Sequence, residues 1–298
     1  MRQFGTENAS TARQIIVTKT VGVEKRLRFH DATGTLRDMV PNCLFQLFAM
    51  LATAPPSGFD AGTMQARKTD VGRAVRVSLP DHAVRGQCAA SRLEGRDLAR
   101  YPAEPGTDLA NRTATYAALL SHVDNWRWAS VWFYPRTGKQ MAQRIAEVAI
   151  RFKKALYASS KDATVDGLLP NWLVPHIQPD KGISLSFAVK QPGPAVELAS
   201  ARMSFRYADW FMVDANVGYK ALMHHYMIGD RTLFQPSNTV ETGWRILAGV
   251  LDAWGSGTGA PIDHATGVEG PPDADELIER DGPRRCWRPV AVNEGGGP

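Results

Sequence analysis

The sequence has few cysteines and no long apolar run, and both absences narrow its class. Its three cysteines, Cys43, Cys88 and Cys286, are isolated and form no CxxC pair. An odd number of widely spaced cysteines argues against a disulfide framework and against a zinc cluster. No apolar segment reaches the roughly 18 residues that a membrane-spanning helix needs. The longest, 44–54, is interrupted by a glutamine and a threonine, so we expect no contact with a membrane.

Motifs that bind nucleotide phosphates are also missing. The chain contains neither GxGxxG nor a Walker A sequence. The glycines of Gly255–Gly259 follow a predicted helix rather than a strand, which favours a flexible connector over a phosphate loop. The first residues, MRQFGTENAS, lack the apolar centre of a signal peptide. The default expectation is therefore a cytoplasmic location.

The charge balance is modest, and the composition is that of a globular protein. Lys and Arg number 35 against 30 Asp and Glu, which gives a net charge of +5. A nucleic-acid-binding protein typically carries one dense basic stripe, whereas the basic residues here are spread along the chain. This pattern argues against nucleic acid as a partner and favours a solvated surface or a site that attracts small anions. The eight tryptophans predict a sizeable core.

The periodicity predicts an α+β fold. Apolar residues recur three and four positions apart over 33–52, which indicates an amphipathic helix. Further helices are predicted at 64–77, 216–228, 238–254 and 271–281. Strands are predicted at 14–20, 114–123, 131–136, 145–152, 172–178, 183–190 and 201–206. Because most strands follow one another without intervening helices, we expect a large, mainly antiparallel open sheet with helices packed on one face.

Several strings resemble those of the glucose-6-phosphate dehydrogenase family. RDMVPNCLFQL at 37–47 resembles the family's RDMVQNHLLQL, and DNWRWASVWFYPRTGK at 124–139 resembles DNWRWAGVPFYLRTGK. Further matches follow in the family's order at 146–153, 171–185, 227–235, 244–254 and 272–282. The resemblance implies the family's carboxy-terminal substrate and dimerisation domain over 14–290. A divergent segment, 1–13, would precede it, and a disordered tail, 291–298, would follow it.

The resemblance also implies an activity and a cofactor. The family oxidises glucose 6-phosphate to 6-phosphogluconolactone with NADP, in the pentose phosphate pathway. Its nucleotide-binding half carries a GxxGDLA fingerprint and a RIDHYLGKE segment, and neither string occurs in these 298 residues. Without a glycine turn at a helix amino terminus, nothing holds the dinucleotide pyrophosphate. We therefore expect that this chain alone binds NADP poorly and does not turn over substrate.

Three residues depart from the family's pattern at the site that the resemblance implies. Cys43 stands where the family has the histidine that removes the sugar proton, and a thiol with a pKa near ~8.5 is a poor base at neutral pH. Pro41 lies inside the predicted helix, where it removes a backbone hydrogen bond and favours a kink. Lys19 stands where the family has a sugar-binding glutamate, and an ammonium only donates hydrogen bonds.

Other positions retain the family's residues. Asp38 matches an aspartate that contacts sugar hydroxyls, and Lys139 matches the lysine of RTGK in the sugar-phosphate site. Arg144 stands where the family has a basic residue near the same site, and Gln178 matches a glutamine near the sugar pocket. For each of them, an ordinary surface role is the alternative.

His224 and His225 are adjacent on a predicted helix, and their side chains diverge by ~100°, which favours a surface or interface pair over metal ligands.

Three functions remain open from the sequence. The chain is part of an NADP-dependent dehydrogenase that needs a second half, or a non-catalytic subunit, or a truncated remnant. As a subunit it would form a homodimer or a heterodimer through the sheet, and glucose 6-phosphate is its expected small-molecule partner. Asp38, Lys139 and Arg144 favour the first function, whereas Lys19, Pro41 and Cys43 argue against it.

Two tryptophans of the DNWRW string, Trp126 and Trp128, are predicted to lie in the core.

Overall fold

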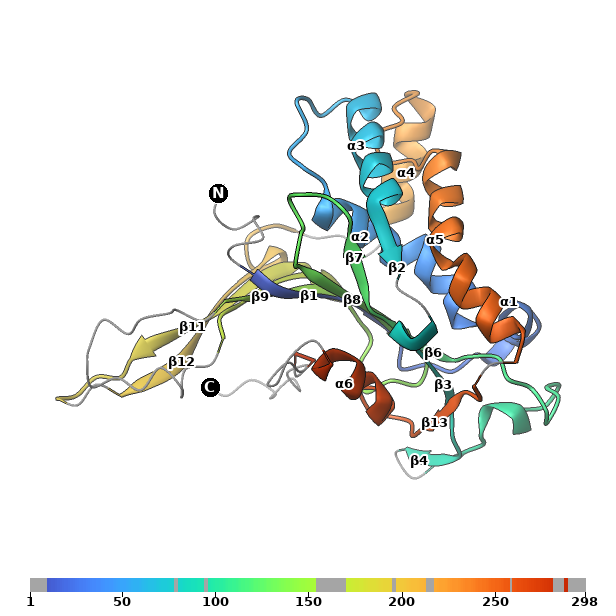
Figure 1. The fold of residues 1–298 in the computed structure, drawn as a ribbon. Coiled ribbons are helices and arrows are strands. Elements are labelled where there is room, and N and C mark those ends of the chain that lie inside the picture. The colour runs from blue at the N-terminus through green and yellow to red at the C-terminus, as the bar shows by residue number, and fades with distance from the viewer. Residues whose placement is uncertain are drawn as a thin grey trace.

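The computed structural model describes residues 10–77, 80–93, 96–153, 170–194, 197–212, 217–257, 259–280 and 287–288. Within these ranges the chain forms one broad, twisted sheet with most of its helices stacked on one face (Figure 1). The predicted tail 291–298, most of the predicted segment 1–13 and Cys286 lie outside the described residues. None of the described helices combines the length and the apolar character that crossing a membrane requires.

The main sheet has eleven strands, and its order differs from the order of the chain. The central path runs β12-β11-β10-β9-β1-β8-β6-β3-β13, while β2 pairs with β7 and β7 with β8. The strands of the path are β1 (Ser10–Thr18), β3 (Ala83–Cys88), β6 (Tyr116–Leu119), β8 (Trp132–Gly138), β9 (Ile145–Phe152), β10 (Trp172–Gln178), β11 (Gly182–Lys190), β12 (Leu198–Arg206) and β13 (Ile262–His264). The short strands are β2 (Val75–Val77), β7 (Ser121–Val123), and the separate hairpin β4 (Ser91–Leu93) and β5 (Arg96–Leu98).

The sheet is mainly antiparallel, as predicted, but two of its pairs are parallel. β1 lies between β8 and β9, parallel to the first and antiparallel to the second, and β13 runs parallel to β3. A parallel pair needs a long connection, and here helices and several strands separate β1 from β8 in the chain. The consequence for the site is that the carboxyl ends of β1 and β8 lie side by side.

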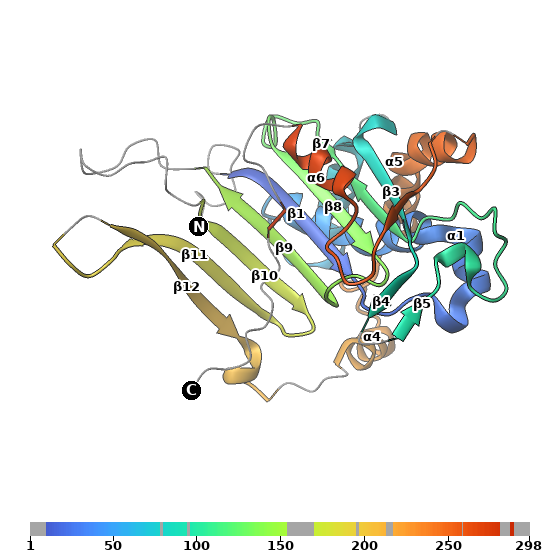
Figure 2. The same ribbon diagram turned by 90° about the horizontal axis from the view of Figure 1, so that it is seen from below.

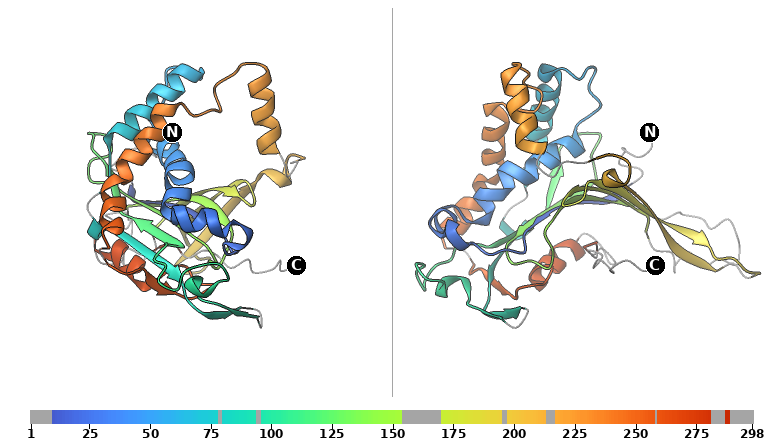
Figure 3. Two further views of the ribbon diagram at one scale, coloured as in Figure 1. Left: turned by 90° about the vertical axis from the view of Figure 1, so that its right-hand side faces the viewer. Right: turned by 180° about the vertical axis from the view of Figure 1, so that it is seen from behind.

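Helices cover mainly one face of the sheet. They are α1 (Leu27–Met39), α2 (Phe45–Ala52), α3 (Ala61–Ala74), α4 (Val217–Met227), α5 (Ser237–Gly255) and α6 (Pro272–Glu279). Figures 1 and 3 show α1, α2, α3 and α5 stacked on one face, whereas α6 lies against the other. The covered face packs through a core that includes Phe48, Leu119 and Phe133, and α6 packs through Leu277 and Ile278.

The predicted helix 33–52 is not a single α-helix. It is interrupted at Gly34, whose φ of 62° lies in the left-handed region that glycine tolerates. A second irregularity follows at Val40–Leu44, which forms one π-helical turn containing Pro41. Proline has no N–H to offer a regular helix, and the wider turn accommodates it between α1 and α2. The expected disturbance beside Asp38 and Cys43 is therefore present as a π turn.

Two tryptophans of one short string have opposite environments. Trp128 is buried, its indole N–H donates to the carbonyl of Ala52 at 2.8 Å, and the guanidinium of Arg13 lies 4.1 Å above its ring centroid. Trp126 is 82% exposed, so its predicted place in the core is wrong. Residues 126–130 form a turn rather than a strand, so the two side chains are not constrained to one face.

The outer strands project beyond the helices. Figure 2 shows β10, β11 and β12 extending away from α1 and α5, so that the far part of the sheet is not covered by helices. Burial falls accordingly across the sheet. β8 is buried at nearly every position, whereas most positions of β12 are exposed.

Candidate functional site

The candidate site is built on the adjacent carboxyl ends of two parallel strands. The β1–β8 register ends at the pair Thr18 and Gly138, so Lys19 and Lys139 are the next residues of neighbouring strands. The N–H of Lys19 donates to the carbonyl of Gly138 at 3.0 Å, and the N–H of Met141 donates to the carbonyl of Lys19 at 2.9 Å. These bonds hold the backbone at Lys19 against the turn that carries Lys139.

The helix side of the site is supplied by the π turn and the end of α1. The π turn packs directly on β1 and β8, which brings Cys43 next to Lys19. Asp38 lies one turn earlier, and its carbonyl accepts a 3.0 Å hydrogen bond from the side-chain amide of Asn42. The structure therefore gathers four of the six residues expected in the site, namely Lys19, Asp38, Cys43 and Lys139.

The thiol of Cys43 is a weaker acid here than in water. Its burial raises the pKa, the charge of Asp38 raises it further, and Lys19 opposes both without reversing the shift. A thiol needs to be deprotonated to accept a proton or to attack. At neutral pH Cys43 is therefore protonated, and it cannot act as a general base in the ground state.

Lys139 is 8% exposed, which is unusual for a lysine. Burial lowers its pKa, the positive charges of Lys19 and Arg26 lower it further, and Asp38 is the carboxylate that opposes them. No described residue forms a hydrogen bond or ion pair with its Nζ. A buried ammonium without such a partner is suited to an anionic ligand.

His30 belongs to the same region and was missed by sequence reasoning. It lies on α1, is 2% exposed, and packs edge-to-face on Tyr101 with ring centroids 5.8 Å apart. Its Nε2 is buried without a hydrogen-bond partner. Burial, followed by the charge of Lys139, lowers its pKa to about 4, so the ring is neutral at pH 7. A single histidine in a helix carries no sequence signal of its burial, which depends here on Tyr101, 71 positions later in the chain.

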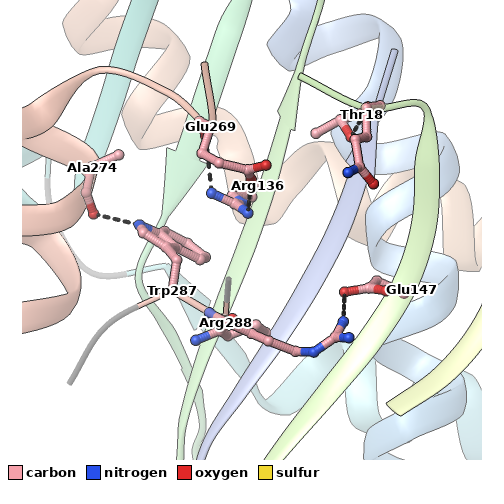
Figure 4. Close-up of polar contacts among 9 residues, drawn as sticks. Thr18, Arg136, Glu147, Glu269, Ala274, Trp287 and Arg288 are labelled. Carbon is pink, nitrogen blue, oxygen red and sulfur yellow. Dashed lines mark hydrogen bonds and ion pairs between the residues drawn. The ribbon is translucent and has the colours of Figure 1, made fainter. Parts of the chain in front are cut away.

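The other two expected residues line a groove. Arg144 and Gln178 are exposed and line a groove of about 590 Å³ whose walls include β10, β11, β12 and Arg288. The floor of this groove contains Glu147, which lies 3.1 Å from Nδ1 of His176 and also pairs with Arg288 (Figure 4). The structure thus places Arg144 and Gln178 in a groove that Arg288 also lines. The hydroxyl of Thr18, the residue before Lys19, donates to the carbonyl of Gln143 at 2.7 Å, so Arg144 follows a residue bonded to the end of β1.

Arg136, on β8 in the RTGK string, has a structural role. It is fully buried, donates to the carbonyl and the carboxylate of Glu269, and stacks 4.5 Å from the ring centroid of Trp287. Figure 4 shows this clamp, together with the bond from Trp287 to the carbonyl of Ala274 on α6. Arg136 therefore ties β8 to α6 and to the segment that precedes it.

The described residues do not fit a dinucleotide. Two strands are followed by a glycine-containing turn and a helix, namely β1 with Gly22 and β13 with Gly270. The side chain of Gln140 occupies the space beside the Cα of Gly22, where a phosphate would have to approach. The ring of Tyr116 occupies the corresponding space beside Gly270. In addition, α6 begins with prolines at its cap and first position, which removes N–H donors that a pyrophosphate would need. Neither turn can cradle NADP.

No metal site is evident either. The described residues contain no group of three or more His, Cys, Asp or Glu side chains arranged to hold a metal ion. His224 and His225 do not converge on one point. Nδ1 of His225 lies 2.9 Å from a carboxylate oxygen of Asp230, and the rings of the two histidines pack edge to face. The acidic partner is five residues along the chain, at the turn that ends α4.

The comparison with protein families decides where this domain belongs. The family described as "Glucose-6-phosphate dehydrogenase, C-terminal domain" matches residues 7–288. The chain belongs to the glucose-6-phosphate dehydrogenase family. It is 34% identical over 281 residues to a glucose-6-phosphate 1-dehydrogenase of Chlamydia pneumoniae, covering 93% of this chain and 54% of that protein. It is 36% identical over 283 residues to the enzyme of Zymomonas mobilis, covering 90% and 56%.

Solved structures agree with this assignment. The crystal structure of glucose-6-phosphate 1-dehydrogenase from Mycobacterium avium superposes with a TM-score of 0.82 and 29% identity, covering 98% of this chain and 58% of that one. A glucose-6-phosphate dehydrogenase in complex with glucose 6-phosphate superposes with a TM-score of 0.85 at 23% identity, which supports the fold. The chain spans about half the length of the curated dehydrogenases that it matches.

Proposed function

We propose that this glucose-6-phosphate dehydrogenase domain binds the phosphate of a sugar phosphate at Lys139, beside Asp38, and does not oxidise the sugar by itself. The observation that carries the proposal is Cys43, which occupies the family's base position with a pKa shifted upward by burial. A missing general base typically costs ~10²–10⁴ in rate. The retained Lys139 and Asp38 support binding, whereas none of the described residues near Cys43 supports removal of the C1 hydroxyl proton.

NADP is the cofactor that the family's chemistry requires, and it would accept the hydride that no side chain can accept. The filled turns at Gly22 and Gly270 support the proposal that this domain does not hold it alone. A nucleotide-binding half would then have to come from elsewhere. Glucose 6-phosphate is the proposed ligand, because the residues matching the family's phosphate and hydroxyl contacts are present.

The proposal is tested by separating binding from turnover. Isothermal titration calorimetry of the chain should show binding of glucose 6-phosphate that Lys139→Gln weakens, and no binding of NADP. With both compounds added, absorbance at the reduced-nicotinamide band should not grow. Reduction of NADP by the purified chain alone, or glucose 6-phosphate binding that is unchanged in Lys139→Gln, would refute the proposal.

A second function, assembly, is favoured by an apolar area on the outer sheet. We define the outer apolar surface as Ile183, Met203, Phe205, Tyr207, Trp210, Phe211 and Met212. Ile183 and Phe205 are direct cross-strand neighbours, and Met203 is 62% exposed. Exposed apolar areas of this kind commonly mark protein interfaces. We propose that the surface pairs two copies of this chain, or one copy with an intact dehydrogenase.

Sedimentation velocity distinguishes these partners. A homodimer would sediment at twice the monomer mass at micromolar concentrations. A heterodimer would form only after addition of a full-length dehydrogenase. A chain that stays monomeric in both experiments would contradict the assembly proposal.

A further inference from the structure

Two lysines at neighbouring strand ends create an excess of positive charge in the candidate site. Lys19 and Lys139 directly follow the last registered pair of the parallel strands β1 and β8. Side chains opposite one another on adjacent strands lie on the same face of a sheet. Like charges placed this way repel each other. Such a pair is stable only when a counter-charge is near.

The surrounding elements supply little of that counter-charge. At the start of α1, Arg26 adds a further positive charge, and from the end of α1 Asp38 adds a single negative one. His30 on α1 is neutral at pH 7, and the thiol of Cys43 in the π turn stays protonated. The three cations Lys19, Lys139 and Arg26 and the single carboxylate of Asp38 leave a net charge of +2. This charge balances the −2 charge of a phosphate monoester dianion.

We infer that Lys19 is a second ligand of the bound phosphate, together with Lys139, and that the site selects small phosphate monoesters by their phosphate rather than by their sugar. The inference rests on the proposed function, which makes Lys139 the first ligand. A phosphate monoester offers three acceptor oxygens, enough to bridge two neighbouring ammonium groups. A lysine cannot accept hydrogen bonds from sugar hydroxyls, so Asp38 is the carboxylate that remains for them.

The test is calorimetric titration, at low ionic strength, with inorganic phosphate, glycerol 3-phosphate, glucose 6-phosphate and glucose. We expect the two monoesters to bind within about tenfold of each other, and glucose not to bind, because the shared contact is to phosphate. Lys19→Glu should weaken every phosphate compound by roughly tenfold or more, and Lys19→Gln by less. Lys190→Glu is the matched control, since Lys190 lies at the far end of β11 and should change nothing.

The outcomes separate this inference from the proposed function. If Lys139→Gln weakens glucose 6-phosphate while Lys19→Glu leaves it unchanged or tightens it, the proposed function stands and Lys19 is not a phosphate ligand. A preference for glucose 6-phosphate over glycerol 3-phosphate above about tenfold would likewise overturn the inference alone. If no phosphate compound binds the wild-type chain, both fail. Circular dichroism spectra of each variant establish that a loss of binding is not a loss of fold.

Discussion

The inner and outer halves of the sheet are built from similar strands and have opposite surroundings. β8 lies between a core shared with α2 and α5 and a second core shared with α6, so both of its faces are buried. β12 has the same extended backbone and is paired with β11 over its whole length, yet its side chains are largely exposed. Backbone pairing alone therefore does not determine where the folding free energy is stored.

The difference assigns different tasks to the two halves. Burial of apolar side chains supplies most of the free energy of folding, and it is concentrated around β1, β8 and β6. The apolar side chains of β12 remain available for association. We therefore expect substitutions in the inner half to lower the free energy of unfolding, and substitutions on the outer apolar surface to change association instead.

The largest expected effect is at Trp128. Trp128→Ala removes a fully buried ring, the bond to Ala52 and the stacking of Arg13, and should lower the free energy of unfolding by about 3–5 kcal/mol. Urea denaturation followed by circular dichroism measures it. Trp126→Ala is the matched control two residues away, and its exposed ring predicts a change within about 0.5 kcal/mol. Equal losses in the two variants would contradict the comparison.

A pH-dependent effect is expected at His30. Its pKa of about 4 in the folded chain lies below the unfolded value of 6.5, so the unfolded chain binds the proton first as the pH falls. The contribution of His30 to stability is therefore complete above pH 6.5 and is lost between pH 6.5 and about 4, amounting to about 3 kcal/mol.

Urea denaturation at several pH values isolates this contribution. His30→Phe keeps an aromatic ring against Tyr101 and removes the titration, so its stability should fall less steeply than that of the wild type over this window. His224→Asn, which alters a histidine exposed on α4, should follow the wild-type curve. Parallel curves for wild type and His30→Phe would show that the pKa of His30 is the same in the folded and unfolded chains.

An intermediate effect is expected at Glu147, on the border between the two halves. Burial alone would raise its pKa, but hydrogen bonds and charge from His176 and Arg288 outweigh burial and lower it. Its stabilising contribution is therefore present at neutral pH and is lost as the pH falls below the normal carboxyl range.

Glu147→Gln removes this charge and leaves Arg288 without its carboxylate, and should cost about 1–3 kcal/mol at pH 7. It should also flatten the loss of stability on acidification, as measured by urea denaturation. Asp124→Asn removes an exposed carboxylate that lies 4.0 Å from Arg76, and serves as the control with no change. A Glu147→Gln variant as stable as this control would show that the buried ion pair contributes no net stability.

The smallest effect on folding is expected on the outer apolar surface. Met203→Asp should leave the free energy of unfolding of the monomer within about 0.5 kcal/mol, because the side chain is already exposed. The same substitution should shift sedimentation toward the monomer. Ser200→Asp, on the opposite face of β12, is the control with both properties unchanged. Destabilisation of the monomer by Met203→Asp would erase the distinction between the two halves.

Local patterns predicted much of this molecule. β9 and β10 have the bounds that alternation indicated, and α5 differs by one residue at each end. The short strands β3 and β13 were missed, because three to six residues carry too little periodicity and their pairing joins segments far apart in the chain. Likewise, no strand was predicted at the hairpin β4–β5. Its two strands have three residues each, which is too short for an alternation of apolar and polar residues to be recognised.

The candidate site shows the same division. The resemblance indicated Lys19, Asp38, Cys43 and Lys139, and the fold gathers them because β1 inserts beside β8. It could not indicate that His30 is buried on α1 or that Arg144 and Gln178 line one groove with Arg288. Whether these two residues contribute to a substrate site stays a prediction, because neither their exposure nor their neighbours assign them a ligand.

The sequence by itself determined most element types, the mainly antiparallel sheet and the chemistry available at each position, including a thiol where the resemblance implies a proton acceptor. These properties depend on residue identity and on spacings of two to four residues. Only the tertiary structure decided which charged side chains face one another, which histidine is buried away from solvent, and which half of the sheet is not covered by helices. Those outcomes depend on contacts between residues tens to more than a hundred positions apart, which no local spacing encodes.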